Sequence, residues 1–219
     1  MKRIIIIGNS SYSDTIRYYI EEDASREVVA YAAEEKYITE DTRNGLPVVN
    51  IDNLIEMYNS EEYSVIMGIG YTDMNSIRER LYNKCLGMGY DIENYIHSTA
   101  VISKNAIIGR GNIFLENAIV GPNCVIGNGN IFFISSVLAH DDIIGDFNFL
   151  SVNVSVAGFV NISDSCFLGI SSTVKNNINI PSSVLLGANA YLSQQVKEGQ
   201  VIVPSKSIVL EGKTSRDFV

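Results

Sequence analysis

One of the two histidines in this 219-residue chain lies in the stretch VLAHDDIIGDF, residues 137–147, where charged residues interrupt an apolar pattern. His140 is followed directly by Asp141. A histidine can act as a general base near neutral pH, and a neighbouring carboxylate can fix the tautomer of its ring and stabilise the imidazolium. A lone histidine is more often a solvated or capping residue. The elements that position the pair therefore decide whether a catalytic role is indicated.

Those elements follow a six-residue period. From Ala100 the sequence divides into sixteen hexads, and the third residue of each is aliphatic or Phe. With 46% hydrophobic residues in the chain, chance would give this pattern roughly four times in a million. The fourth residue is usually small, as at Gly121, Ala139 and Gly145. The period predicts a hexapeptide β-helix, a prism of short parallel strands joined by tight turns.

If three hexads form one coil, residues eighteen apart stack at about 4.8 Å. In this register Leu138 points inward, and His140 falls near a corner of the prism and points outward. Gly158 lies one coil further on, so we expect its backbone N–H near the imidazole, with room for a carbonyl group to approach. The stacked glycine favours catalysis over a merely solvated histidine. His97 precedes the first hexad and is interpreted as structural, and Asp142 and Asp146 as residues that hydrate or cap turns.

The first 97 residues follow a different pattern, in which predicted strands and helices alternate. This order is typical of a small Rossmann-like parallel sheet of the nucleotide-binding kind. We therefore expect an α/β domain over residues 1–97 and a β-helix with a C-terminal tail over residues 98–219. The predicted strands cover residues 2–8, 27–32 and 63–70, the predicted helices cover 12–22, 52–58 and 74–88, and 91–98 is expected to connect the domains.

Composition excludes several classes of protein. The net charge of −9, with no cluster of Lys and Arg, argues against nucleic-acid binding. The three cysteines, Cys85, Cys124 and Cys166, share no metal-ligand spacing and are expected to be reduced and apolar, with no metal bound. Apolar runs such as Ile4–Ile7 are far shorter than the ~18 residues of a membrane span. We expect a cytoplasmic protein without a membrane span.

Four stretches together carry a family resemblance: IIIIGNSS (4–11), IGYTDMNSIRERLY (69–82), YIHSTAVIS (95–103) and AHDDIIGDF (139–147). The chain resembles bacterial sugar acetyltransferases of the hexapeptide-repeat family, nearest to the nucleotide-amino-sugar N-acetyltransferases and the sialic acid O-acetyltransferases. The resemblance implies a homotrimer of left-handed parallel β-helices. It also implies acetyl-CoA between neighbouring prisms and the nucleotide of a sugar substrate in the N-terminal domain.

The resemblance also implies roles for residues of the β-helix. His140 would be the general base and Asp141 its acidic partner, and Gly158 would donate its N–H to the acetyl carbonyl. Asn176 continues the column of His140 and Gly158 by another eighteen residues and suits the pantetheine arm. By resemblance, the backbone at Ile170 and Ala188 would also contact CoA.

Three departures from the family pattern affect the expected substrate site. In the loop GNSSYS, Ser11, Tyr12 and Ser13 replace a common Gly-His-Gly, and their side chains are expected to narrow the space. Glu34, after Ala33, replaces an acidic pair, and Phe149 stands where relatives often carry a second histidine near the acceptor, with Asn148 beside it. The expected substrate-binding residues are Gly8, Ser10, Ser11, Glu34, Gly70 and Phe149.

Four functions remain open at this point. The first is N-acetylation of a nucleotide-linked deoxyamino sugar for a surface glycan, and the second is O-acetylation of a sugar hydroxyl, as in sialic acid. The third is a β-helical scaffold or binding module without catalysis. The fourth is a hexapeptide-repeat carbonic anhydrase, which needs three histidines on zinc, whereas this chain has two.

Overall fold

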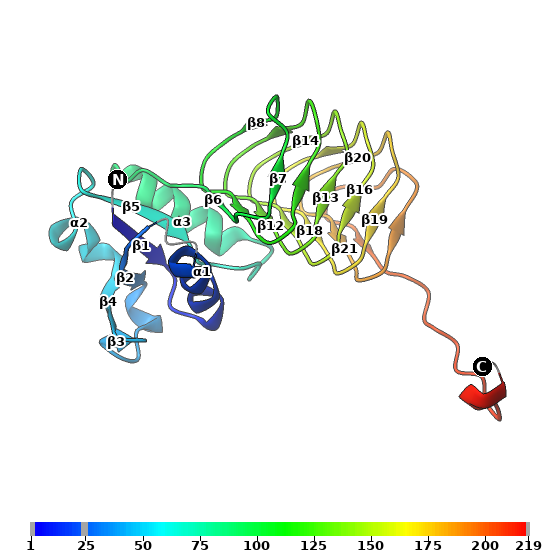
Figure 1. Cartoon of the computed structure of the whole chain (residues 1–219), viewed down its shortest axis with the longest axis horizontal. Helices are drawn as coiled ribbons and strands as arrows, with labels where there is room; N and C mark the ends of the chain where they lie inside the picture. Colours follow the sequence, from blue (N-terminus) through cyan, green and yellow to red (C-terminus); the bar gives the residue numbers. More distant parts are fainter. Residues whose placement is uncertain (1–2, 23–25, 218–219) are drawn as a thin grey trace.

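The computed structural model describes residues 3–22 and 26–217. It contains a small α/β domain, a three-sided parallel β-helix and an extended C-terminal tail (Figure 1). The predicted fold class, a Rossmann-like domain followed by a left-handed parallel β-helix of hexapeptide repeats, is confirmed.

The N-terminal sheet has five strands in the order β3-β4-β2-β1-β5. The three predicted strands are present, and the sequence interpretation missed β3 and β4, which form an antiparallel hairpin. Its signal was the dipeptide Asn44-Gly45, where both residues have positive φ (48° and 79°), as a two-residue hairpin turn requires. The strands are β1 (Arg3–Ile7), β2 (Val28–Ala33), β3 (Thr42–Arg43), β4 (Leu46–Asn50) and β5 (Tyr63–Met67).

Helices pack on both faces of this sheet. The third predicted helix begins later than expected, at Ser76, because Asp73, Met74 and Asn75 all have left-handed backbone, with φ of 52°, 45° and 71°. The second is a 3-10 turn followed by a single helical turn. The helices are α1 (Ser11–Glu22), α2 (Leu54–Met57) and α3 (Ser76–Gly87), with 3-10 turns η1 (Glu35–Tyr37), η2 (Ile51–Asn53) and η3 (Ser215–Asp217).

Each of the sixteen hexads forms one two-residue strand at its second and third positions. One further strand precedes the hexads, within the stretch predicted as a connection, and one follows them. The strands are β6 (Tyr95–Ile96), β7 (Val101–Ile102), β8 (Ile107–Ile108), β9 (Ile113–Phe114), β10 (Ile119–Val120), β11 (Val125–Ile126), β12 (Ile131–Phe132), β13 (Val137–Leu138), β14 (Ile143–Ile144), β15 (Phe149–Leu150), β16 (Ser155–Val156), β17 (Asn161–Ile162), β18 (Phe167–Leu168), β19 (Thr173–Val174), β20 (Asn179–Ile180), β21 (Leu185–Leu186), β22 (Tyr191–Leu192) and β23 (Val201–Ile202).

These strands stack into three parallel sheets, the faces of the prism: β7 to β22, β8 to β20 and β6 to β23. The register confirms the eighteen-residue coil, since Val120 pairs with Leu138 and Leu138 with Val156. Third-position residues fill the interior, each contributing about 1.5 to 3 kcal/mol on burial. The first hexad position, which the sequence interpretation did not use, is buried as well, for example at Cys124 and Cys166.

Close stacking explains the small fourth residue of the hexad. A Cβ atom at Gly121 would lie only 1.5 Å from the carbonyl oxygen of Ala139 in the next coil. The sixth position instead turns the corner with left-handed backbone, which Asn, Asp and Gly adopt most readily. Two bulky residues, Phe147 and Phe159, also occupy this position, with φ of 57° and 61°.

The two domains are joined through a buried arginine. Arg78 of α3 is fully buried and donates hydrogen bonds to the carbonyl oxygens of Gly129 (2.8 Å), Phe147 (2.9 Å) and Asn148 (3.2 Å) in the β-helix. It also donates to the carbonyl of Gly70. Burial lowers the pKa of the Arg78 guanidinium to about 10, which leaves it charged at neutral pH.

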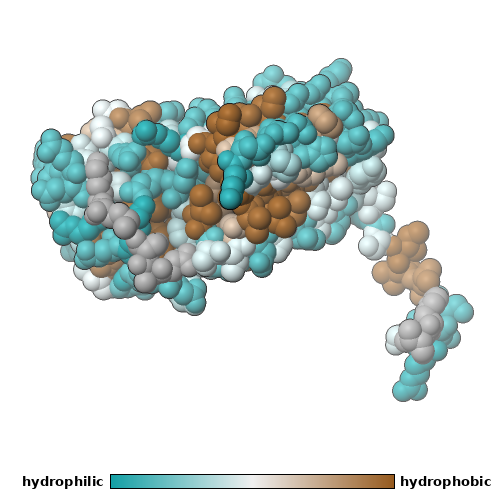
Figure 2. Space-filling model, turned by 45° about the horizontal axis from the view of Figure 1, so that its top comes forward, coloured by the Kyte–Doolittle hydropathy of each residue, from teal (hydrophilic) through white to brown (hydrophobic). Residues whose placement is uncertain are grey.

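The C-terminal tail runs away from the prism after β23 (Figure 1). Ile208 and Val209 are more than four-fifths exposed, and an apolar group of side chains is visible on the tail in Figure 2. In the described part of the chain, no helix has the length and apolar character to cross a membrane.

Candidate active site

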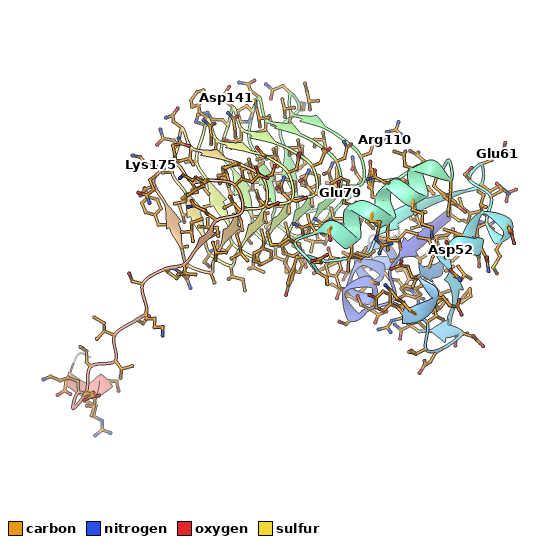
Figure 3. The ribbon with its side chains drawn as sticks, turned by 180° about the vertical axis from the view of Figure 1, so that it is seen from behind. Asp52, Glu61, Glu79, Arg110, Asp141 and Lys175 are labelled. Carbon is orange, nitrogen blue, oxygen red and sulfur yellow. The ribbon has the colours of Figure 1, made fainter. Side chains whose placement is uncertain are left out.

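His140 and Asp141 follow strand β13 and lie at a corner of the prism, as the hexad register predicts. The corner is fixed by stacking, because the N–H of Asp141 donates to the carbonyl of Pro122 one coil earlier (2.9 Å). Asp141 itself has φ of 55°, a conformation that aspartate tolerates. Figure 3 shows Asp141 at the outer edge of the β-helix.

The two side chains form the expected pair. Nδ1 of His140 lies 2.8 Å from Oδ2 of Asp141, and Oδ1 of Asp141 accepts a hydrogen bond from the side-chain amide of Asn123 (3.0 Å). The contact with His140, and then that with Asn123, lowers the pKa of Asp141, so its carboxylate stays ionised at neutral pH. An ionised acceptor at Nδ1 favours the tautomer with its proton on that atom. Nε2 of the neutral ring is thereby left free to accept a proton.

Gly158 lies directly beside the imidazole. A Cβ atom at this position would lie 2.5 Å from Cε1 and 2.7 Å from Nε2 of His140. The N–H of Gly158 donates to no acceptor among the described residues. A buried backbone donor without a partner next to a base is suited to bind the oxygen of a reacting carbonyl group.

We expect Gly158→Ala to lower kcat by about 10- to 100-fold without unfolding the β-helix. The backbone of Gly158 is not left-handed, so alanine fits it, but the added methyl group must displace the ring of His140. Turnover and thermal unfolding of the two proteins check this. Gly87→Ala, where a Cβ atom meets nothing within 4 Å, is the matched control and should retain activity; normal turnover in Gly158→Ala would contradict the assigned geometry.

The acid after the pair points inward. Asp142 is fully buried, and its Oδ1 accepts the N–H of Val160 (2.8 Å), while Oδ2 has no partner. Burial raises the pKa of Asp142 to about 6. The interpretation of Asp142 and Asp146 as turn caps agrees with these bonds, since Oδ1 of Asp146 accepts the N–H of Asn128 (2.6 Å).

The three residues expected to contact CoA are all exposed, but they do not meet within one chain. Asn176 lies on the corner of His140 and Gly158. Ile170 and Ala188 lie on the corner at the other edge of the face formed by β13, β16, β19 and β22. The two groups of expected CoA contacts therefore lie at opposite edges of this face.

Phe149, which is expected near the acceptor, does not lie beside His140 of the same chain. It is 4% exposed, on the face of β6 to β23, opposite the corner of His140. There it packs against the rings of Tyr71 (5.0 Å) and Phe167 (5.5 Å). Asn148 is buried and hydrogen-bonded to Asn130 of the preceding coil, so it is not an exposed substitute for a second histidine.

A cavity of about 310 Å³ lies in the N-terminal domain, at the carboxyl ends of β1, β2 and β5. Four of the predicted substrate residues, Gly8, Ser10, Glu34 and Gly70, contribute to its lining. Ser11 does not; it begins α1 and is exposed. The remaining walls include Asn9, Tyr37, Thr72, Ile77 and Leu81.

The expected narrowing of this cavity by the GNSSYS loop is wrong for all three of its side chains, since Ser11 does not line the cavity. Ser13 is buried and donates its hydroxyl to the carbonyl of Gly68 (2.8 Å). Tyr12 packs its ring on Phe133 of the β-helix (6.3 Å). Both follow from the helix that starts at Ser11, which turns these residues toward the sheet and the β-helix.

Glu34 is held in place at the mouth of the cavity. Arg80 donates two hydrogen bonds of 2.9 Å to its carboxylate, and this pairing lowers the pKa of Glu34. A fixed, ionised carboxylate after the second strand of a Rossmann-like sheet is a hydrogen-bond acceptor for ribose hydroxyl groups.

Sequence reasoning missed two residues of the corner. Asn123 was detectable, because it lies eighteen residues before Asp141. Phe159 follows Gly158, and its ring lies edge-on to the imidazole (5.2 Å, 89°). The structural interpretation of His97 fits its surroundings, since its Nδ1 bonds to Thr99 (2.9 Å) and its ring packs on Tyr19.

The fold and the corner define a two-domain protein in which a Rossmann-like domain precedes a hexapeptide-repeat β-helix. Residues 3–85 match the family model of the PglD N-terminal domain. The resemblance to hexapeptide-repeat sugar acetyltransferases is thereby confirmed at the level of the fold. No curated protein sequence matches the chain.

Similar solved structures cover nearly the whole chain. The acetyltransferase domain of PglB from Neisseria gonorrhoeae aligns with a TM-score of 0.83 and 21% identity, over 92% of this chain and 96% of that one. PerB from Caulobacter crescentus, solved with CoA and GDP-perosamine, aligns with a TM-score of 0.81 and 22% identity, over 94% and 97%. WeeI from Acinetobacter baumannii aligns with 0.81 and 20%, over 93% and 97%.

The described residues were also compared with the side-chain groups that coordinate metal ions. Within residues 3–22 and 26–217, His, Cys, Asp and Glu form no group of three or more that could hold a metal ion.

Proposed function

We propose that this chain is an acetyl-CoA-dependent sugar acetyltransferase that acetylates the amine of a nucleotide-linked amino sugar. The observation that carries the proposal is the corner where His140, paired with Asp141, lies beside the free N–H of Gly158. The PerB structure supports it, because that protein has the same fold and was solved with CoA and GDP-perosamine.

The corner provides what acetyl transfer needs. The acceptor nitrogen attacks the thioester carbonyl carbon while Nε2 of His140 takes its proton, and Asp141 stabilises the imidazolium that results. The N–H of Gly158 donates to the carbonyl oxygen as negative charge develops on it. The carbon–sulfur bond then breaks, the acetyl group stays on nitrogen, and the proton on His140 passes to the departing thiolate of CoA.

The positions of the two sites favour an active site shared between subunits, as in the proposed homotrimer. His140 lies on the corner opposite the face that the N-terminal domain covers. A sugar bound in the cavity of Gly8, Ser10, Glu34 and Gly70 would therefore react at the His140 of a neighbouring copy. Asn176 of one copy and Ile170 and Ala188 of another would hold CoA between them.

The GNSSYS loop bears on the choice of acceptor. Because Tyr12 and Ser13 point away from the cavity, a nucleotide still has space there. This favours a nucleotide-linked sugar over a free sugar hydroxyl. We place the reaction in the cytoplasm, which supplies acetyl-CoA and nucleotide sugars, and its product in the synthesis of a surface glycan.

The test is release of CoA thiol from acetyl-CoA with different acceptors. We expect release with nucleotide-linked amino sugars and none with the same nucleotides without the sugar. Release only with free sugars that offer hydroxyl groups would support O-acetylation instead. If no sugar promotes release, the proposed function is wrong and a scaffold or binding role is favoured.

Glu34→Gln is expected to raise the KM for the nucleotide sugar by about tenfold, since a charged hydrogen bond contributes roughly 1.5–3 kcal/mol. Its kcat should change little, because the cavity binds the part of the substrate that does not react. Asp52→Asn is the matched control, since Asp52 also pairs with a basic residue of α3, Lys84, but does not line the cavity. Equal KM values for Glu34→Gln and the unsubstituted protein would rule out Glu34 as a substrate residue.

A further inference from the structure

Phe159 interrupts a polar ladder at the corner of His140. The sixth residues of the hexads stack here, and the amide of Asn105 bonds to Asn123 (2.5 Å), whose amide bonds to Asp141 (3.0 Å). The next residue in this column is Phe159, after which polar residues return. The whole column reads Asn105, Asn123, Asp141, Phe159, Asn177 and Gln195.

The backbone of Phe159 is strained for a residue of its size. Its φ is 61°, whereas the neighbouring positions of the column with similar φ carry Asn, at Asn123 and Asn177. A bulky residue in this region costs about 1 kcal/mol or more relative to Asn or Gly. Core burial does not offset the cost, because Phe159 is 54% exposed.

This strained turn is hydrogen-bonded to the segment that carries the candidate base, residues 140–142. The N–H of Phe159 donates to the carbonyl of His140 (3.1 Å), and the N–H of Val160 donates to the carboxylate of Asp142 (2.8 Å). Strain that the surroundings maintain in this way is found most often at functional sites.

The imidazole is therefore in contact with groups on three sides. Asp141 bonds to Nδ1, the backbone of Gly158 lies beside the ring, and the ring of Phe159 stands perpendicular to it, with centroids 5.2 Å apart. His140 is about half exposed, so without Phe159 its side chain would have open space on that side.

We propose that Phe159 is a positioning residue, which holds the ring of His140 in the orientation that presents Nε2 to the acceptor. An amide at this place would continue the ladder and compete with His140 for the carboxylate of Asp141. The aromatic ring cannot donate a hydrogen bond to Asp141. It therefore ends the ladder and leaves the carboxylate of Asp141 to bond to His140. This inference rests on the proposed acetyl transfer.

The decisive variant is Phe159→Asn, which installs the residue that the same column uses at similar φ. We expect kcat to fall about 10- to 100-fold, the KM for acetyl-CoA to stay within about twofold, and Tm to stay equal or rise. Phe159→Tyr keeps the perpendicular ring and should retain kcat within about threefold. Ser183→Asn, at another corner with φ of 60°, is the matched control and should leave kcat unchanged.

Two results would overturn the role of Phe159: a normal kcat in Phe159→Asn, or a loss of kcat that accompanies a lower Tm and also occurs in Phe159→Tyr. Failure of the proposed function would look different. In that case the unsubstituted protein would not transfer acetyl groups, or His140→Ala would transfer them at the normal rate.

Discussion

His140→Ala is expected to lower kcat by about a hundredfold to ten-thousandfold while the β-helix stays folded. General-base catalysis by a positioned side chain contributes that much. The fold should tolerate the change because the His140 side chain is about half exposed and its contacts are confined to the corner. Thiol release from acetyl-CoA, measured at saturating acceptor, reports the loss.

The other histidine of the chain provides the control. His97→Ala removes contacts with Thr99 and Tyr19 near the start of the β-helix and should leave kcat close to normal. Asp141→Asn should reduce kcat less than His140→Ala, because the base remains but its tautomer is no longer fixed. Unchanged turnover in His140→Ala would remove the basis for the catalytic pair.

Arg78→Met is expected to cause the largest loss of stability, about 3 kcal/mol in the free energy of unfolding. Methionine has a similar length but leaves the carbonyl oxygens of Gly129 and Phe147 buried without their donor, whereas that of Asn148 keeps the N–H of Ile131. Each such group costs about 1–3 kcal/mol, and the two costs are not fully additive. Urea denaturation measures the change.

Arg80→Ala, on the same helix two residues further on, is the matched control. Its partner is Glu34 at the domain surface, and its own side chain is half exposed. Exposed ion pairs contribute about 0–1 kcal/mol. If Arg78→Met and Arg80→Ala cost the same, Arg78 does not join the domains in the way that its hydrogen bonds indicate.

The β-helix could be predicted from sequence because its rule is local. Every hexad repeats an apolar third residue, usually followed by a small fourth residue, so the register alone placed His140 at a corner and Gly158 beside it. The buried first position was harder to recognise, because it accepts both apolar residues such as Val154 and buried polar ones such as Asn130 and Asp142.

Residues whose surroundings come from the other domain could not be placed this way. The pattern of hexads puts Phe149 on an outer face, but only the docking of the N-terminal domain turns that face into an interior one. The sequence likewise gives no sign that Arg78 is buried, because its partners lie in the β-helix against which α3 packs. Phe159 was not recognised because its left-handed backbone is a property of the turn, and the residue type gives no sign of it.

The arrangement of the two sites in one chain also explains why the complete active site could not be predicted from the sequence. The cavity at Glu34 and the corner at His140 lie on different sides of the β-helix, and the two corners expected to bind CoA flank one face without meeting. We propose that neighbouring copies bring the two sites together, so that the sugar bound by the N-terminal domain of one subunit reacts at His140 of another.

A crystal structure with CoA and a nucleotide-linked amino sugar tests the central claim most directly. The account predicts the thiol of CoA beside Gly158 and the sugar amine at hydrogen-bond distance, about 3 Å, from Nε2 of His140. It also predicts the nucleotide in the Glu34 cavity of a neighbouring copy. CoA bound away from the corner of His140 and Gly158, or a sugar amine out of reach of His140, would contradict the account.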